Sequence, residues 1–371
     1  MRISSLRGRF CGVLLGLLAG PAPAARPAAE PPVFKARYIK STLLRVARWQ
    51  LAHPRHAPTD WTNGAFYAGV FAAYETTHSQ LILDSLLALG ERTHWRPGPR
   101  YDHADDIAIG QTYLNLYRLK KDRRMLQPTL DAVAKFRREP GPEVQGHGIA
   151  WWWCDALFMG PPVLEKLGVI ENDPSYFTLT DTLYRQAYRR LFNHDEHLFA
   201  RDASYLVNAA GEGQKESNGQ KIFWSRGNGW VMGGLVQILT ELPKGHPSRP
   251  FYTQLFQEMS ARLVQLQQPD GLWRSSLLDP GAYPGGEASG SGFDCYALAW
   301  GLNRGLLTGP QFRPAVEKAW VALNGLVSPE GRVGWVQPIG ADPRRDFSAD
   351  SWEVYGTGAF LLAGSEVIKL K

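Results

Sequence analysis

The sequence contains little cysteine and no metal-binding pattern. Three cysteines occur in 371 residues, which is too few for a disulfide framework in a chain of this length. Cys154 and Cys295 both lie in apolar helical patterns, where we expect buried free thiols. Residues 103–106 supply one histidine and two carboxylates, but no second cluster of ligands completes a site. We therefore predict that the protein binds no metal and needs no cofactor.

Strong charge, long apolar runs and the common nucleotide and nucleophile motifs are also absent. The formal net charge is +6, which is too mild to indicate a nucleic-acid partner. No segment is apolar for long enough to span a bilayer. The sequence has neither a G-x-S-x-G elbow nor a glycine-rich phosphate loop. These absences disfavour a nucleic-acid binder, a membrane-spanning protein and the enzyme classes that those two motifs mark.

Residues 1–24 have the composition of a secretory signal peptide. They carry Arg2, Arg7 and Arg9 but no acidic residue, then a short apolar run, then small residues at Ala22 and Ala24. Removal of three arginines lowers the formal net charge of the chain from +6 to +3. We expect an exported protein, periplasmic or extracellular, that leaves the membrane after cleavage near Ala24.

The rest of the chain alternates two kinds of helical segment. With 44% hydrophobic and 20% charged residues, the chain can bury a large core. Amphipathic segments, each with one wet face, cover residues 34–52, 78–93, 122–139, 173–192, 249–267 and 308–327. Segments that are nearly free of charge after their first turn cover residues 60–75, 103–117, 151–167, 224–239, 292–307 and 351–367. Six buried helices inside six amphipathic ones satisfy both patterns, so we predict an all-α, (α/α)6-barrel domain over residues 25–371.

Two connections are longer than the others. Residues 192–223 and 268–291 are rich in Gly, Asp and Ser, and residues 197–213 alternate enough to predict a small β-hairpin. Long loops in a compact domain are often functional, so we expect these loops near the site.

Polar residues open each of the buried segments. If these helices run in one direction, their first turns converge on one mouth of the barrel and form a bowl. An acidic residue at a helix start also caps backbone N–H groups, which is the structural alternative for each of them. The residues concerned are Asp60, Asp105, Asp106, Asp155, Arg226, Asn228, Asp294 and Glu353.

Asp155 is the strongest catalytic candidate in the bowl. It follows Trp151, Trp152 and Trp153, and desolvation by indole rings raises the pKa of a carboxyl group toward the range of a general acid. Asp105 and Asp106 point about 100° apart on a helix, so one of them can cap while the other faces the bowl. Tryptophan rings stack on sugars, although each is equally explained as core; the candidates are Trp151 to Trp153, Trp224, Trp230 and Trp273.

Several blocks of the sequence resemble the signature blocks of glycoside hydrolase family 105, the unsaturated rhamnogalacturonyl hydrolases, which are akin to the unsaturated glucuronyl hydrolases. The blocks are ADDIAIGQTYLNLY, WWWCDALFM, WSRGNGWV, DGLWRSSLLDP, YALAWGLN and GWVQPIGADP. The resemblance covers nearly the whole chain after the signal peptide. It implies an (α/α)6 barrel that removes a 4-deoxy-Δ4,5-unsaturated uronic acid from the non-reducing end of lyase-generated oligosaccharides, such as rhamnogalacturonan fragments.

The resemblance also implies roles for individual residues. An aspartate of the family protonates C4 of the unsaturated sugar and activates the water that attacks C5; here it corresponds to Asp155. Asp106, or its neighbour Asp105, is the second carboxylate. The W-x-R-G-N-G-W block assigns substrate binding to Trp224, Arg226 and Trp230, with Arg226 facing the substrate carboxylate.

Three further residues are candidates for substrate binding. Trp153 belongs to the tryptophan cluster, and His147 precedes the catalytic aspartate as a histidine does in some family members, at a different spacing. Arg201, with Asp202, stands where other members have a histidine. The sequence leaves open the aglycone and the source polysaccharide.

Two other functions fit the same residues. One is an inverting glycosidase that uses Asp106 and Asp155 on a saturated glycoside. The other is a sugar-binding protein that uses the tryptophan bowl without turnover. We expect a monomeric or weakly associated hydrolase whose ligand is an unsaturated uronyl oligosaccharide.

Overall fold

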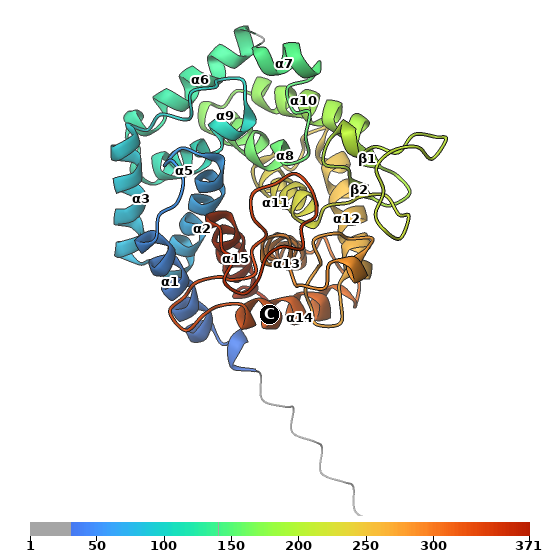
Figure 1. The fold of residues 1–371 in the computed structure, drawn as a ribbon. Coiled ribbons are helices and arrows are strands. Elements are labelled where there is room, and N and C mark those ends of the chain that lie inside the picture. Colours follow the sequence, from blue (N-terminus) through green and yellow to red (C-terminus); the bar gives the residue numbers. More distant parts are fainter. Residues whose placement is uncertain (1–30, 140) are drawn as a thin grey trace, which may run out of the picture. The chain divides into compact units, whose positions relative to one another are not determined.

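Two concentric rings of helices make up the protein in the computed structural model, which describes residues 31–139 and 141–371 (Figure 1). Residues 32–371 form one unit. The predicted signal peptide, residues 1–24, lies outside the described residues. Within the described ranges, no helix is both long enough and apolar enough to cross a membrane.

The inner ring contains the segments that the sequence predicts to be buried. Each inner helix packs against the next, and the last packs against the first, which closes the ring. These helices are α2 (Trp61–Thr77), α5 (Gly110–Lys120), α9 (Pro161–Glu171), α11 (Ser225–Glu241), α13 (Ala288–Asn303) and α15 (Val354–Val367). The outer ring consists of α1 (Ala36–Ala52), α3 (Gln80–Thr93), α6 (Gln127–Arg138), α10 (Ser175–Leu191), α12 (Arg249–Leu266) and α14 (Phe312–Gly325). The predicted (α/α)6 barrel is confirmed.

Burial explains why the two kinds of segment separate. Every residue of α15 is buried, whereas α1 buries only one face. Glycines let neighbouring inner helices approach closely: a Cβ atom at Gly69 in α2 would lie 2.3 Å from the carbonyl oxygen of Gly358 in α15. A larger residue at either position would force the two helices apart.

Short elements connect the rings. The helices α4 (Ala104–Ile107), α7 (Pro142–His147) and α8 (Ala156–Met159) precede or interrupt inner segments. Single 3-10 turns occur at η1 (Pro32–Phe34), η2 (Arg123–Met125), η3 (Ala203–Tyr205) and η4 (Pro280–Ala282). Cys154 and Cys295 are free and buried, as the sequence predicts.

The small hairpin lies earlier in the chain than its predicted place at residues 197–213. Strand β1 (Phe192–Asn193) pairs antiparallel with β2 (Leu198–Phe199), with Phe192 opposite Phe199. The chain does not continue as a strand after Phe199 because the side chain of Asp202 accepts hydrogen bonds from the backbone N–H and the hydroxyl of Ser204. Those bonds cap η3 and turn the loop back toward the barrel.

Candidate active site

Asp155 lies at the N-terminus of α8 and is almost fully buried, with 8% of its surface exposed. The Cys154 thiol donates to its Oδ2 over 3.4 Å, and Nε of Arg201 lies 3.8 Å from the same oxygen. Burial raises the pKa of Asp155, while the charges of Arg201 and Arg226 oppose that rise. The pKa of Asp155 is therefore raised, in the direction that the sequence analysis expects, and two cations moderate the effect.

Asp105 and Asp106, the adjacent carboxylates of α4, have different surroundings. Asp106 is held by Arg100, whose backbone N–H, Nε and NH2 donate to its two oxygens over 2.8, 2.9 and 2.5 Å. Asp105 accepts no such bonds. Burial, followed by the charge of Asp155, raises the pKa of Asp105 to about 8. Asp105 is thus the carboxylate that interacts with Asp155, and Asp106 anchors the loop that carries Arg100.

A histidine and a glutamate stand beside Asp105. His103 caps α4 by accepting from the backbone N–H of Asp105, and its Nε2 lies 3.9 Å from Oε1 of Glu143. Burial, together with the charge of Arg100, lowers the pKa of His103, so its ring is neutral at neutral pH. Sequence analysis did not single out Glu143, because an acidic residue in the first turn of a helix, here α7, normally signals only helix stability.

The aromatic side chains of residues 151–153 divide into a buried and an accessible set. Trp151 is only 1% exposed, and Trp153 is 3% exposed and packs on the His103 ring at 4.7 Å. Trp152 is partly exposed; its Nε1 donates to Glu143 over 2.9 Å. The exposed ring of His147 stacks on Trp152 at 4.0 Å, and the Arg201 guanidinium lies 5.4 Å from the Trp152 ring centroid. Trp152 therefore brings His147, Glu143 and Arg201 together.

Arg226 is fully buried between two rings, 4.4 Å from Trp224 and 4.7 Å from Tyr355. Its NH1 donates to the carbonyl of Gln337 over 2.7 Å, and its NH2 to that of Pro338 over 3.0 Å. These contacts fasten the loop between α14 and α15 to α11. Direct contact between Arg226 and a substrate carboxylate stays a prediction; among the described residues, none accepts a hydrogen bond from its Nε. 

The two tryptophans of the same block are buried as well. Trp224 is 2% exposed and its Nε1 donates to Oε1 of Gln337 over 3.3 Å. Trp230 is fully buried against Phe293, at 4.4 Å between ring centroids. Trp273 is also fully buried and donates to the carbonyl of Leu263. In this structure the three rings pack within the core, which is the alternative that the sequence left open for each.

Asp60 and Asp294, two further acidic residues expected at the mouth, differ in their surroundings. Asp60 caps α2 by accepting from the backbone N–H and hydroxyl of Thr62. Asp294 was predicted near a helix start, but α13 begins at Ala288, so Asp294 lies inside the helix, fully buried. Burial, with the charge of Glu287, raises the pKa of Asp294 far above its usual range. Glu287, which the sequence did not suggest, caps α13 instead, accepting from Ser289 and Gly290.

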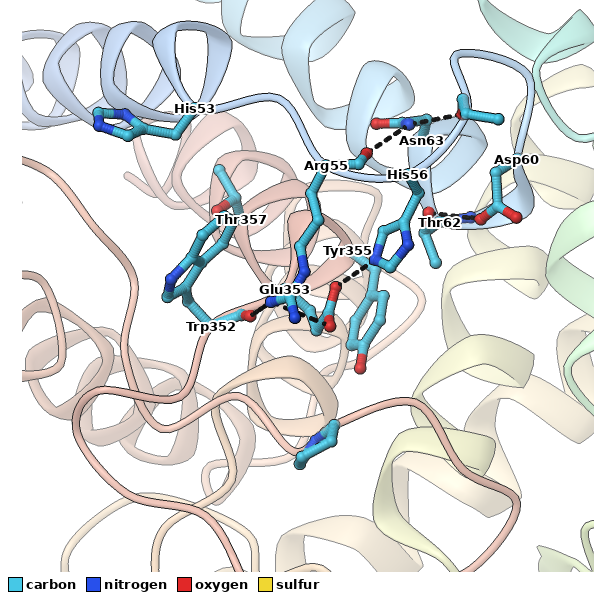
Figure 2. A network of polar contacts seen from close by, with 12 residues as sticks. His53, Arg55, His56, Asp60, Thr62, Asn63, Trp352, Glu353, Tyr355 and Thr357 are labelled. Atoms are coloured by element: carbon cyan, nitrogen blue, oxygen red, sulfur yellow. Dashed lines mark hydrogen bonds and ion pairs between the residues drawn. The ribbon is translucent and has the colours of Figure 1, made fainter.

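Glu353 belongs to a polar network between α2 and α15 (Figure 2). Its Oε2 lies 2.7 Å from Nε2 of His56, and its Oε1 lies 3.2 Å from NH1 of Arg55. Arg55 also donates to the carbonyl of Trp352 over 2.8 Å. Asn63 of α2 holds this loop by donating to the carbonyls of Arg55 and Ala57. The network joins the first and last inner helices where the ring closes.

A large cavity of about 660 Å³ lies at the other end of the inner helices. Its walls come from the C-terminal halves of α2, α11, α13 and α15, and it contains none of the predicted site residues. Glu241 accepts there from Arg118 and Lys166. Burial alone would raise the pKa of Glu241, but those two cations hold it at about 2. We interpret this end as a network of ion pairs and place the candidate site around Asp105 and Asp155.

Chemistry at the candidate site rests on carboxyl groups beside a cation and aromatic rings. In the part of the chain that the structure describes, no three His, Cys, Asp or Glu side chains gather as a metal-ion site. Asp155 can give and take a proton, Arg201 can bind an anion, and Trp152 with His147 offers a flat surface for a sugar.

Comparisons with known proteins show the family and the fold of the chain. The family model for Glycosyl Hydrolase Family 88 matches residues 36–371. An unsaturated 3S-rhamnoglycuronyl hydrolase from Formosa agariphila is 44% identical over 344 residues, which cover 90% of this chain and 91% of the relative. A solved glycosyl hydrolase family 88 structure from Bacteroides vulgatus has a TM-score of 0.82 at 28% identity, covering 91% of this chain and 99% of that one. A possible family 105 member from Salmonella enterica has a TM-score of 0.75 at 20% identity, covering 94% and 97%, and so shares the fold.

Proposed function

The chain belongs to glycosyl hydrolase family 88, and from this membership we propose that it removes a 4-deoxy-Δ4,5-unsaturated uronic acid from the non-reducing end of oligosaccharides. The name of the Formosa agariphila relative supports a substrate in which the uronic acid is joined to rhamnose. The observation that carries the proposal is the buried carboxyl group of Asp155, which lies 3.8 Å from the guanidinium of Arg201 and whose charge raises the pKa of Asp105.

The reaction adds water across the C4–C5 double bond of the uronic acid. Asp155 in its acid form gives its proton to C4, which leaves positive charge at C5 stabilised by the ring oxygen. The Asp155 carboxylate then takes a proton from a water molecule as the oxygen of that water bonds to C5. The resulting hemiketal opens, and the sugar chain leaves from C1 with a proton on its glycosidic oxygen. The net change is hydration followed by release of the aglycone.

Asp105, not Asp106, is the second carboxylate of this mechanism. Asp105 interacts with Asp155, whereas the oxygens of Asp106 are occupied by Arg100. Arg201 binds the uronate carboxylate, since it is the cation nearest to Asp155 and part of its side chain is exposed. Trp152, with His147 stacked on it, covers one face of the sugar.

Turnover of an unsaturated disaccharide and of its saturated twin tests the proposal. We expect the ultraviolet absorbance of the double bond to disappear with the unsaturated sugar, and no cleavage of the saturated sugar. Cleavage of the saturated twin would identify an inverting glycosidase, and binding of both sugars without turnover would identify a sugar-binding protein.

The location and assembly of the protein are part of the same proposal. Residues 1–24 direct export, and the mature hydrolase acts as a monomer on oligosaccharides that a polysaccharide lyase has released. Detection of the mature chain in a periplasmic or culture fraction, with a new N-terminus after Ala24, tests this part.

A further inference from the structure

A second pocket lies beside the loop between α14 and α15, apart from Asp155. It has a volume of about 360 Å³, and its walls include Tyr283, Trp335, Arg344, Arg345 and Phe347. Three aromatic rings and two guanidinium groups therefore line a hollow of the size of one sugar residue. None of these five residues takes part in the chemistry proposed for Asp155.

The pocket belongs to the same end of the barrel as Asp155. The backbone N–H of Ala288, the first residue of α13, donates to the carbonyl of Trp335 over 2.9 Å. Two residues later, Gln337 is fastened to Arg226 of α11. The side chain of Gln337 also donates to the carbonyl of Asp342, five residues farther along the loop, over 2.7 Å. The loop that carries Trp335, Arg344 and Arg345 thus rests on the N-terminal ends of α11 and α13.

The loop also approaches Arg201, which lies beside Asp155. Burial is the largest cause of a raised pKa at Tyr205; the charges of Asp342 and Asp202 raise it further, and the charge of Arg201 lowers it. These three charged side chains therefore lie around Tyr205. Arg201 is in turn 3.8 Å from Asp155. The loop that carries the pocket and the residues beside Asp155 therefore belong to the same end of the barrel.

The aromatic residues of the pocket are held in position. Tyr283 is buried, and its hydroxyl donates to Oε2 of Glu216 over 3.1 Å. The Trp335 and Phe347 rings meet edge to face at 6.2 Å. Trp335 has a φ of +55°, which lies in the left-handed region that non-glycine residues rarely adopt. Hydrogen bonds on both sides of Trp335, from Ala288 and to the carbonyl of Ser348, maintain that conformation.

The charge of the pocket is positive. Arg344 is paired with Asp346 through two hydrogen bonds of 2.9 and 2.5 Å. Arg345 lies 5.0 Å from the ring centroid of Tyr283, and no acidic residue among those described forms an ion pair with it. One arginine charge is therefore left for a ligand. A guanidinium group binds sulfate or carboxylate through two parallel hydrogen bonds, and the flanking rings suit the apolar face of a sugar.

We infer that this pocket binds an anionic sugar of the aglycone, one that bears a sulfate ester or a carboxylate. The inference rests on the proposed function, because the pocket has meaning as an aglycone site only if the terminal sugar is held at Asp155. It adds a determinant of substrate choice: chains with an anionic group at the right distance bind better than neutral chains of the same length.

The test compares three unsaturated substrates: a uronyl-rhamnose disaccharide, the same disaccharide with a sulfate ester on rhamnose, and a tetrasaccharide with a second uronic acid. We expect Arg345→Gln to raise KM about tenfold for a substrate with a second anionic group that reaches the pocket, and to leave kcat and the KM of the unsulfated disaccharide unchanged. An effect on the sulfated disaccharide identifies a sulfate site, and an effect on the tetrasaccharide alone identifies a carboxylate site. Arg332→Gln is the matched control, because Arg332 pairs with Asp350 on the same loop outside the pocket.

Trp335→Ala separates stacking from charge. It should weaken binding of the tetrasaccharide and the sulfated disaccharide alike, because ring contact does not depend on the anion. If Arg345→Gln changes the KM of neither the sulfated disaccharide nor the tetrasaccharide, the inference is wrong. It is also wrong if the KM of the unsulfated disaccharide changes equally. In both cases the proposed function stands.

Calorimetric binding keeps the test independent of turnover. Saturated sulfated and uronate-containing tetrasaccharides are titrated into wild-type protein and Arg345→Gln. Should wild type cleave no unsaturated sugar, the proposed function fails. A weaker Kd for Arg345→Gln would still identify the pocket as an anionic sugar site, and an unchanged Kd would overturn it.

Discussion

Burial and the negative charge of Asp155 raise the pKa of Asp105 to about 8. Burial raises the pKa of Asp155 as well, against the charges of Arg201 and Arg226. At neutral pH Asp105 therefore keeps its proton. The raised pKa of Asp155 favours the acid form, which can deliver a proton to carbon and then accept one from water.

Asp105→Asn should move the alkaline limb of the pH–rate profile to lower pH. Asp105 is the carboxyl group whose pKa is raised to about 8, and asparagine cannot titrate, so the variant loses the group that sets a limb near pH 8. We expect a shift of roughly one pH unit or more in kcat/KM. The neighbouring variant Asp106→Asn serves as control; it should lower the free energy of unfolding by about 1–3 kcal/mol and leave the limb in place. If the alkaline limb does not move in Asp105→Asn, the ionisation of Asp105 is not linked to the chemistry at Asp155.

Arg226→Ala should destabilise the whole domain. The change leaves the carbonyls of Gln337 and Pro338 without donors and opens a hole between Trp224 and Tyr355. We expect the free energy of unfolding to fall by about 2–4 kcal/mol in denaturant titrations. Arg313→Ala, which removes an exposed helix pair with Glu317 and an exposed hydrogen bond to the carbonyl of Lys371, should change it by about 1 kcal/mol or less.

The same variant tests the role that the sequence resemblance gives Arg226. If Arg226 contacts the substrate directly, Arg226→Ala weakens the binding of an unsaturated uronate far more than the binding of a neutral analogue. Equal losses for the two ligands would mean that Arg226 acts only through the loop that it holds.

The arrangement of the helices could be predicted from the sequence because burial determines the spacing of apolar and charged residues along each helix. Segments that must hide every face carry almost no charge, whereas those with one wet face carry charge at helical spacing. Asp155 could be identified as a candidate for a related reason. Burial of a carboxylate among tryptophans costs free energy, so its presence there indicates a function. Both arguments need only neighbouring residues.

The features that sequence analysis missed depend on contacts between distant residues. Arg226 meets carbonyls at residues 337–340, more than a hundred positions away, and no local pattern indicates that partnership. The start of α13 was misplaced because residues 285–292 are rich in glycine and serine and read as a loop. Those small residues are needed there: a Cβ atom at Gly290 would lie 2.4 Å from the Ser225 hydroxyl of α11.

Activity should survive removal of metal ions. Prolonged dialysis against a strong chelator should leave kcat unchanged, because the proposed proton transfers need only Asp155 and Asp105. Metal content after dialysis is measured in parallel to show that removal was complete. Loss of activity that a divalent ion restores would require a different assignment of the site.

Glu241→Gln should destabilise the far end of the barrel in a pH-dependent way. The folded-state pKa of Glu241 is about 2, below its usual 4.5, so the carboxylate stabilises the fold above pH 4.5 and loses that effect as pH falls toward 2. The shift corresponds to about 3 kcal/mol at neutral pH. Denaturant titrations of wild type and variant should therefore differ at pH 7 and converge in acid. The exposed control Glu317→Gln should show a small difference at every pH.

Asp155→Asn should bind the unsaturated sugar and fail to convert it. Asparagine keeps the shape of the side chain but can neither give a proton to C4 nor take one from water, so turnover should fall by several orders of magnitude while Kd changes little. Thermal unfolding should confirm that the variant is folded.

Turnover of wild type in heavy water makes the test specific for hydration. Because the proton from Asp155 goes to carbon, the released product should carry deuterium at C4, where ordinary displacement at the anomeric carbon places none. The C4–deuterium bond forms before the hemiketal opens, so the label should appear in every molecule of product from the first turnover. Product without that label, or an asparagine variant with nearly normal rate, would remove Asp155 from this role and favour the inverting glycosidase.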